Sequence, residues 1–346
     1  MRTKQLQPFH GGSSVVNSKR IRDKRIDYIK AVAVIMVIVH HCLSYYDTTY
    51  HELSQLERLS IVLLHTSHVP IFCMVAGYLC HKQPIVSFYK KKVFRILIPF
   101  VFFSALKILY AVFVSAEFRH GGSTIVDQIS FSFLVGTQYW FAYAIFGIFL
   151  LAPLFWDRGG ATLPRALVAL IVSYIVVLLI TIIGYNPIPN YFQLQEIIYY
   201  LPYFAVGCLI NQLNEETRAH YNNRKELICI SAIMVFLFSV VYIFIPGIRI
   251  HPVRFFIAVA IAYLIFTAIA QLKTHDNKVL LLISKYSLQI MFLDGLYRVV
   301  LFSVVDKVVG INFLISALIS IPTIAFSIIT CLIAEKISPI RFLFGL

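Results

Sequence analysis

The chain has 346 residues, of which 59% are hydrophobic and only 13% charged, and its mean hydropathy is +0.81. One soluble globule cannot bury this much apolar surface, so the composition argues against a soluble enzyme and predicts an all-α, polytopic membrane protein. The net charge of +14 is dispersed over short loops, which argues against a nucleic-acid partner and for contact with a lipid bilayer.

Apolar stretches of membrane length recur along the chain and predict about ten transmembrane helices. Loops rich in Lys and Arg alternate with loops that hold few, and the N-terminal tail is strongly basic. The positive-inside rule therefore places both termini in the cytoplasm, as an even number of spans requires. We predict a basic, disordered cytoplasmic tail over residues 1–24 and a single transmembrane domain over residues 25–346. The predicted spans are 26–46, 59–80, 94–115, 133–155, 165–184, 197–212, 226–246, 254–272, 286–304 and 311–334.

The first span carries ionisable residues at both ends of one helix. Asp27 and Lys30 stand near its start, and His40 and His41 near its end. Lys30 and His41 are eleven residues apart, so they share a helical face at roughly 16 Å along the axis, with Asp27 on the same stripe and His40 about 100° away. Ionisable groups inside a span cost roughly 2.5–3.5 kcal/mol each, so this stripe is a candidate functional site.

Two further histidines, His65 and His68, stand in the second span, near His41 in the predicted topology. These three imidazoles could ligate zinc, but no carboxylate partner or HxxxH pattern accompanies them, and the cysteines show no metal-ligand spacing. The sequence favours proton-accepting histidines and no metal, since imidazole titrates near neutral pH. Purely structural, hydrogen-bonded histidines stay an open alternative for all three.

A run of cations crowds the start of the third span, where Lys90, Lys91, Lys92 and Arg95 occur within six residues. Topological anchoring explains such a run without any ligand. The alternative is a phosphate site, because several cations at one mouth attract a polyanion and Arg95 can bind a phosphate with two hydrogen bonds. Lys30 is predicted at the same depth, so a phosphorylated donor bound there could extend along the first helix toward His41.

Aromatic residues recur at the ends of the later spans. Trp140 and Tyr143 are three residues apart and could line a cavity, although an interfacial aromatic belt is an equal alternative. Interfacial anchoring is the simplest interpretation of Tyr199, Tyr200 and Tyr203.

One carboxylate lies inside the ninth span. Asp294 stands four residues before Arg298. An ion pair within one helix is the simplest interpretation of this spacing.

Taken together, these segments resemble the acyltransferase-3 family of bacterial integral-membrane O-acyltransferases. That family opens with an arginine or lysine followed, after ten residues, by a histidine, usually behind an aspartate, and Asp27, Lys30 and His41 match this pattern. HVPIFCMVAGYL, KKKVFRILIP and QYWFAYAIFGIFLLAPLF resemble its second, third and fourth landmarks, and YLPYFAVGCLI and SKYSLQI resemble later ones. The likeness covers roughly residues 25–300.

The resemblance implies a ten-helix O-acyltransferase, most commonly an O-acetyltransferase, of the bacterial plasma (inner) membrane. Acyl-coenzyme A, usually acetyl-coenzyme A, would be a donor substrate rather than a bound cofactor. The acceptor would be a hydroxyl of a cell-surface or lipid-linked carbohydrate, with polysaccharide-assembly machinery as a further partner. His41, Lys30 and Asp27 would be the catalytic residues. The donor or acceptor would contact Lys91, Lys92, Arg95, His68, Trp140 and Tyr143.

Three positions depart from the family pattern. Lys30 stands where arginine is commoner, so a bidentate contact is lost. Ala76 replaces the serine of the second-span segment, and Asp294 falls where many members have histidine.

Two other functions fit the sequence. A transporter or glycan exporter could use the histidines as a proton relay, and a non-catalytic subunit could serve a polysaccharide-assembly complex. Acyl transfer from acetyl-coenzyme A by the purified protein distinguishes an enzyme from both.

Overall fold

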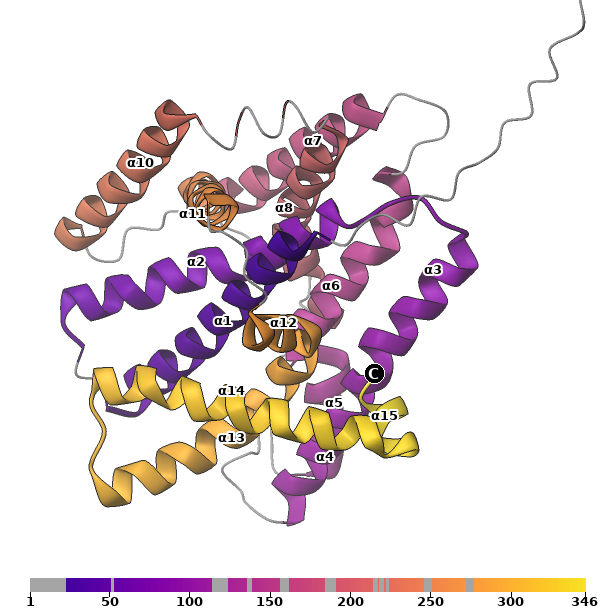
Figure 1. The fold of residues 1–346 in the computed structure, drawn as a ribbon, viewed down its shortest axis with the longest axis vertical. Coiled ribbons are helices and arrows are strands. Elements are labelled where there is room, and N and C mark those ends of the chain that lie inside the picture. Colours follow the sequence, from indigo (N-terminus) through magenta and orange to yellow (C-terminus); the bar gives the residue numbers. More distant parts are fainter. Residues whose placement is uncertain are drawn as a thin grey trace, which may run out of the picture.

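The computed structural model is a bundle of helices, and the residues it describes contain no strand (Figure 1). Among the described residues there are two π-helical segments and two 3₁₀ segments besides the α-helices. The description covers residues 23–50, 53–113, 124–135, 139–155, 162–183, 191–213, 217, 221, 224–245, 251–271 and 277–346. Residues 1–22 of the predicted tail lie outside these ranges.

The helical segments follow the predicted spans closely. The third span is continuous from α3 through a π-helix, η1, into α4, and the fourth joins α5, the π-helix η3 and α6. The elements are α1 (Lys24–Tyr50), α2 (Gln55–Tyr78), α3 (Ile85–Lys92), η1 (Val93–Leu97), α4 (Ile98–Phe113), α5 (Ile125–Ser130), η3 (Phe131–Val135), α6 (Trp140–Leu151), η5 (Ala152–Phe155), α7 (Thr162–Ile183), η6 (Tyr191–Gln193), α8 (Leu194–Gln212), α10 (Lys225–Phe244), α11 (His251–Gln271), α12 (Lys278–Lys285), α13 (Ser287–Val308), α14 (Phe313–Lys336) and α15 (Ser338–Leu343).

Nine segments of the described chain are long and apolar enough to cross a membrane. The predicted sixth span, 197–212, corresponds to α8, which falls outside this set. It is less apolar because it carries Glu196 and several tyrosines. Its 19 residues still extend about 28 Å, close to the thickness of a bilayer core. The all-helical, polytopic architecture is therefore confirmed. A count of ten spans that includes α8 stays a prediction.

Helix α1 forms the centre of the bundle and packs against α2, α11, α12, α13 and α14 (Figure 1). Small and β-branched side chains, including Ala31, Ala33 and Val34, are fully buried along it. Because α1 is apolar on most of its surface, its sequence does not fix which face meets which neighbour.

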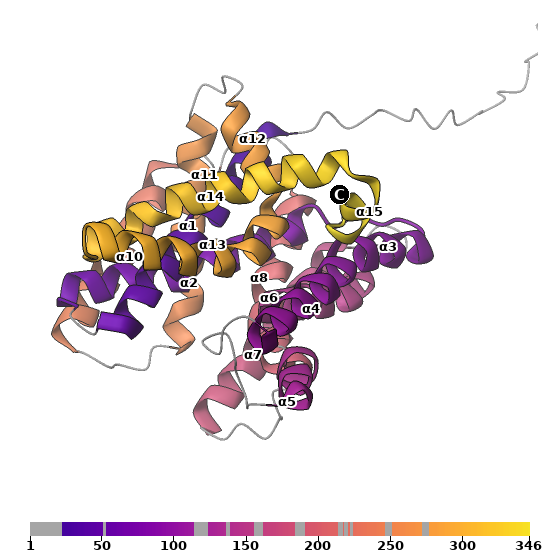
Figure 2. The same ribbon diagram turned by 90° about the horizontal axis from the view of Figure 1, so that it is seen from below.

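The start of α1 and the last helices lie at the same end of the bundle. The Ser284 hydroxyl on α12 donates to Asp27 Oδ1 at 3.0 Å, and Gln289 Nε2 on α13 donates to the Phe344 carbonyl at 2.8 Å. In both views α15 lies beside α3 (Figures 1 and 2). This arrangement agrees with an even number of spans, while the assignment of that end to the cytoplasm stays a prediction.

Helices α2 and α8 cross with their backbones in contact. A Cβ atom added at Gly77 would lie 2.0 Å from the Phe204 carbonyl oxygen, and one added at Gly207 would lie 1.9 Å from the Met74 carbonyl oxygen. Only glycine fits at either position, so each helix supplies the residue that lets the other approach. The crossing holds the histidines of α2 beside the tyrosines of α8.

Candidate active site

His41 forms a hydrogen bond with a buried carboxylate on another helix. Its Nδ1 lies 2.7 Å from Oδ2 of Asp294 on α13. The side chain of Asp294 is 3% exposed, whereas that of His41 is 32% exposed. An ionised carboxylate only accepts hydrogen bonds, so Nδ1 carries the proton and Nε2 keeps a free lone pair. This tautomer is the one that a general base requires.

Two cations lie near the carboxylate of Asp294. Arg298 Nε lies 3.5 Å from Asp294 Oδ1, which confirms the predicted pair within α13. The Arg298 guanidinium also lies 5.3 Å from the centre of the Tyr45 ring on α1. The charge of Lys107, on α4, acts on the same pair. A buried carboxylate stays ionised when such neighbours compensate its desolvation.

His41 opens onto a small cavity of about 50 Å³. Two of the predicted substrate-binding residues, His68 and Trp140, share it with His41. The cavity is lined by Val37, His41, His68, Val69, Tyr139, Trp140, Phe141, Ala142, Leu288, Met291 and Phe292.

A larger cavity of about 530 Å³ lies between α2, α6, α7, α8 and α11. Its walls combine aromatic rings with amide, carboxylate and guanidinium groups, and Trp140 stacks on Tyr200 with ring centres 5.6 Å apart. We refer to it as the aromatic cavity. It is lined by His65, Thr66, Pro70, Trp140, Tyr174, Val177, Gln193, Gln195, Glu196, Tyr199, Tyr200, Pro202, Tyr203, Arg254 and Phe255.

Three of the predicted site residues, His41, His68 and Trp140, line these cavities. Trp140 lines both of them, whereas the Tyr143 hydroxyl donates to the Phe133 carbonyl and lines neither. The expected interfacial anchors Tyr199, Tyr200 and Tyr203 instead line the aromatic cavity. Glu196 and Arg254 were not expected at a site, since neither shows any motif in the sequence.

The predicted phosphate-binding cations gather near the start of α1. The positive charge of Lys92 is repelled by the charges of Lys30, Lys91 and Arg95. Its ammonium group lies 3.4 Å from the centre of the Phe149 ring. We refer to these four cations as the basic cluster. Arg95 is exposed and lies in the π-helix η1, a distortion that often accompanies functional sites.

Asp27 and Lys30 lie far from the ring of His41. Because α1 is continuous, they stand about 21 Å and 16 Å from it along the helix axis. Asp27 is buried and accepts the hydrogen bond from Ser284, which ties α1 to α12. Any contact of these two residues with a substrate is therefore with the end remote from His41.

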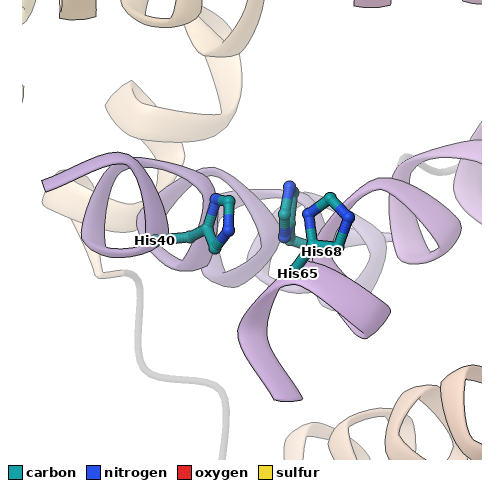
Figure 3. Close-up of side chains that lie close together, drawn as sticks. All are labelled: His40, His65 and His68. Atoms are coloured by element: carbon teal, nitrogen blue, oxygen red, sulfur yellow. The ribbon is translucent and has the colours of Figure 1, made fainter. Parts of the chain in front are cut away.

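The histidine grouping differs from the one considered from the sequence. His40, not His41, joins His65 and His68, and one ring nitrogen of each lies within 4.8 Å of those of the other two (Figure 3). We refer to these residues as the histidine cluster. Viewed down the axis of α1, His41 lies about 100° from His40. His41 therefore faces α13, whereas His40 faces α2.

Comparison with known proteins assigns the chain to a family. The model of the acyltransferase domain family matches residues 23–332. Nodulation protein NolL of Sinorhizobium fredii (strain NBRC 101917 / NGR234) is 28% identical over 234 residues, a match that covers 65% of this chain and 58% of that relative. No solved structure matches the chain. With its many membrane-length helices, the chain is a multi-pass membrane protein that belongs to the acyltransferase family.

Proposed function

We propose that this protein is a membrane O-acyltransferase, and specifically an O-acetyltransferase, of the bacterial plasma membrane. It transfers the acyl group from cytoplasmic acyl-coenzyme A to a hydroxyl of a cell-surface or lipid-linked carbohydrate. The observation that carries the proposal is the hydrogen bond between His41 and buried Asp294 beside a cavity.

In the proposed reaction His41 is the general base. Its Nε2 removes the proton from the acceptor hydroxyl as the hydroxyl oxygen attacks the thioester carbonyl carbon. The tetrahedral intermediate then expels the coenzyme thiolate, and Nε2 transfers its proton to that thiolate. Asp294 stabilises the imidazolium that exists between the two transfers, so it acts as a positioning residue.

The basic cluster is suited to the donor. Its four cations repel one another, and the phosphates of a coenzyme relieve this repulsion. A donor anchored there lies about 16 Å along α1 from His41, a distance that its extended arm would bridge. Lys30 and Asp27 would then act at the phosphate end rather than at the reacting atoms.

The aromatic cavity is suited to a saccharide. Its aromatic rings offer apolar faces for sugar rings, and Gln193, Gln195, Glu196 and Arg254 offer donors and acceptors for hydroxyl groups. Trp140 lines this cavity and the small cavity at His41, so an acceptor bound here has a short path to the general base.

Arg95→Lys tests the donor site while keeping the positive charge that sets topology. An ammonium group cannot make the bidentate contact of a guanidinium with a phosphate. The KM for acyl-coenzyme A should therefore rise by about 10-fold, with little change in kcat. Steady-state kinetics of the purified protein measures this. Lys90→Gln is the matched control from the same basic run, and an unchanged KM in Arg95→Lys would favour pure topological anchoring.

The proposed activity is tested with purified protein and acetyl-coenzyme A labelled in the acetyl group. We expect release of free coenzyme thiol that depends on an added glycan acceptor, and labelled ester on that acceptor by mass spectrometry. Mass spectrometry of surface glycans from cells with and without the gene identifies the acceptor. Gradient-driven movement of a glycan across vesicles without ester formation would instead support a transporter.

A further inference from the structure

The histidine cluster brings three imidazoles from two helices together beside the His41 cavity. The ring centres of His40 and His65 are 5.0 Å apart, and those of His40 and His68 are 4.9 Å apart (Figure 3). We propose that the cluster binds one zinc ion through these three side chains and leaves a fourth coordination position open. This inference is independent of the acyl-transfer proposal.

The hydrogen bond of His68 leaves a lone pair for a metal. Its Nδ1 bonds the Leu64 carbonyl oxygen one turn earlier on α2, and a carbonyl only accepts, so Nδ1 carries the proton. The other nitrogen, Nε2, is then deprotonated. Metal-binding histidines are usually oriented by such a bond from the non-ligating nitrogen.

His40 has a tautomer that offers a second lone pair. Its Nε2 lies 3.2 Å from the Ser44 hydroxyl. That hydroxyl can accept a hydrogen bond from Nε2–H, which leaves Nδ1 deprotonated. Its Nδ1 is buried and has no hydrogen-bond partner within the described part of the chain. A buried nitrogen without a partner is costly, and a bound cation removes that cost.

The geometry is close to that of a zinc site. Zinc holds imidazole nitrogens at 2.0–2.1 Å, which places two ligand nitrogens roughly 3.4 Å apart in a tetrahedron. One ring nitrogen of each histidine lies within 4.8 Å of one from each of the other two, so rotations of the rings can bring three nitrogens to the distances of a zinc site. His65 is the exposed member and has the most freedom to close on the ion.

A proton is the competing occupant, since it could be shared between two of the rings. The charges of Arg298 and Arg254 act on His40 and His65, so any cation here has positive neighbours. Zinc carries twice the charge of a proton and is repelled more strongly, but it forms three coordinate bonds where a shared proton forms one hydrogen bond. The lone pairs therefore favour the metal ion.

The cluster lies between the two cavities. His65 lines the aromatic cavity and His68 lines the small cavity that contains His41. A hydroxyl bound in either cavity would therefore lie near the zinc ion, and zinc acidifies a hydroxyl that it coordinates.

Metal content is the direct test. The full-length protein, purified in detergent through a tag without histidines, is stripped with chelator, incubated with zinc chloride and desalted. We expect near-stoichiometric zinc by mass spectrometry, and a visible spectrum of tetrahedral cobalt when cobalt replaces zinc. His65→Ala should lose both signals, while Ser44→Ala should weaken zinc affinity by about 10–100-fold.

His81→Ala is the matched control, because His81 lies beyond α2 and bonds the Leu79 carbonyl. Removing exposed His65 should leave the elution profile in size-exclusion chromatography unchanged. Zinc retention equal to His81→Ala in a well-folded His65→Ala protein would overturn the proposal. So would the absence of zinc and of the cobalt spectrum from folded wild-type protein.

Discussion

His41→Ala should lower the rate of acyl transfer by about 10²–10⁴-fold, the contribution expected of a general base. The loss should fall on kcat, because the donor is held by the basic cluster far along α1. The measurement is transfer from acetyl-coenzyme A by protein purified in equal amounts.

The variant should stay folded, since Asp294 keeps Arg298 as a partner when the imidazole is removed. His81→Ala again serves as the control. Near-wild-type transfer by His41→Ala would show that His41 takes no part in the reaction. Asp294, which acts through His41, would then have no role in it either.

Asp294→Asn should lower kcat by a similar factor, about 10²–10⁴-fold, while the KM for the donor changes little. Asparagine is nearly the same size and its amide oxygen can still accept from Nδ1. It supplies no negative charge, so the imidazolium formed during the reaction loses its stabilisation. A rise in the KM for the donor with an unchanged kcat would contradict this role.

Stability must be separated from catalysis in this variant. Removing the carboxylate leaves the Arg298 guanidinium without its partner, which costs about 3–5 kcal/mol in buried pairs. The double variant Asp294→Asn, Arg298→Gln removes that uncompensated charge. We expect it to recover thermal stability but not kcat, whereas recovery of both would make Asp294 purely structural.

Much of the architecture followed from the sequence alone. Membrane-length apolar runs located the helices, and the gap between Lys30 and His41 fixed their separation, because α1 proved to be one uninterrupted helix. The clustering of Lys91, Lys92 and Arg95 around one helix start was also visible. All of these features depend on residues that lie close together in the sequence.

The partners of the histidines could not be found this way. Asp294 is 253 positions from His41, and its obvious neighbour in the sequence was Arg298. Whether His40 or His41 faces α2 depends on the rotation of α1 about its axis. The polar stripe of α1 does not reveal that rotation, because other helices pack against α1 on several sides. The aromatic cavity is assembled from five helices, so single residues such as Glu196 and Arg254 carried no signal.

The backbone contact of α2 with α8, made possible by Gly77 and Gly207, restricts how an acceptor can enter. Without side chains between their backbones, α2 and α8 have no soft layer that could compress or repack. We therefore expect these two helices to move as one unit, and the entrance to open by rotation of side chains such as Tyr174 and Arg254 on the opposite walls. Changes of acceptor preference should accordingly arise on α7 and α11, while α2 and α8 stay unchanged at their crossing.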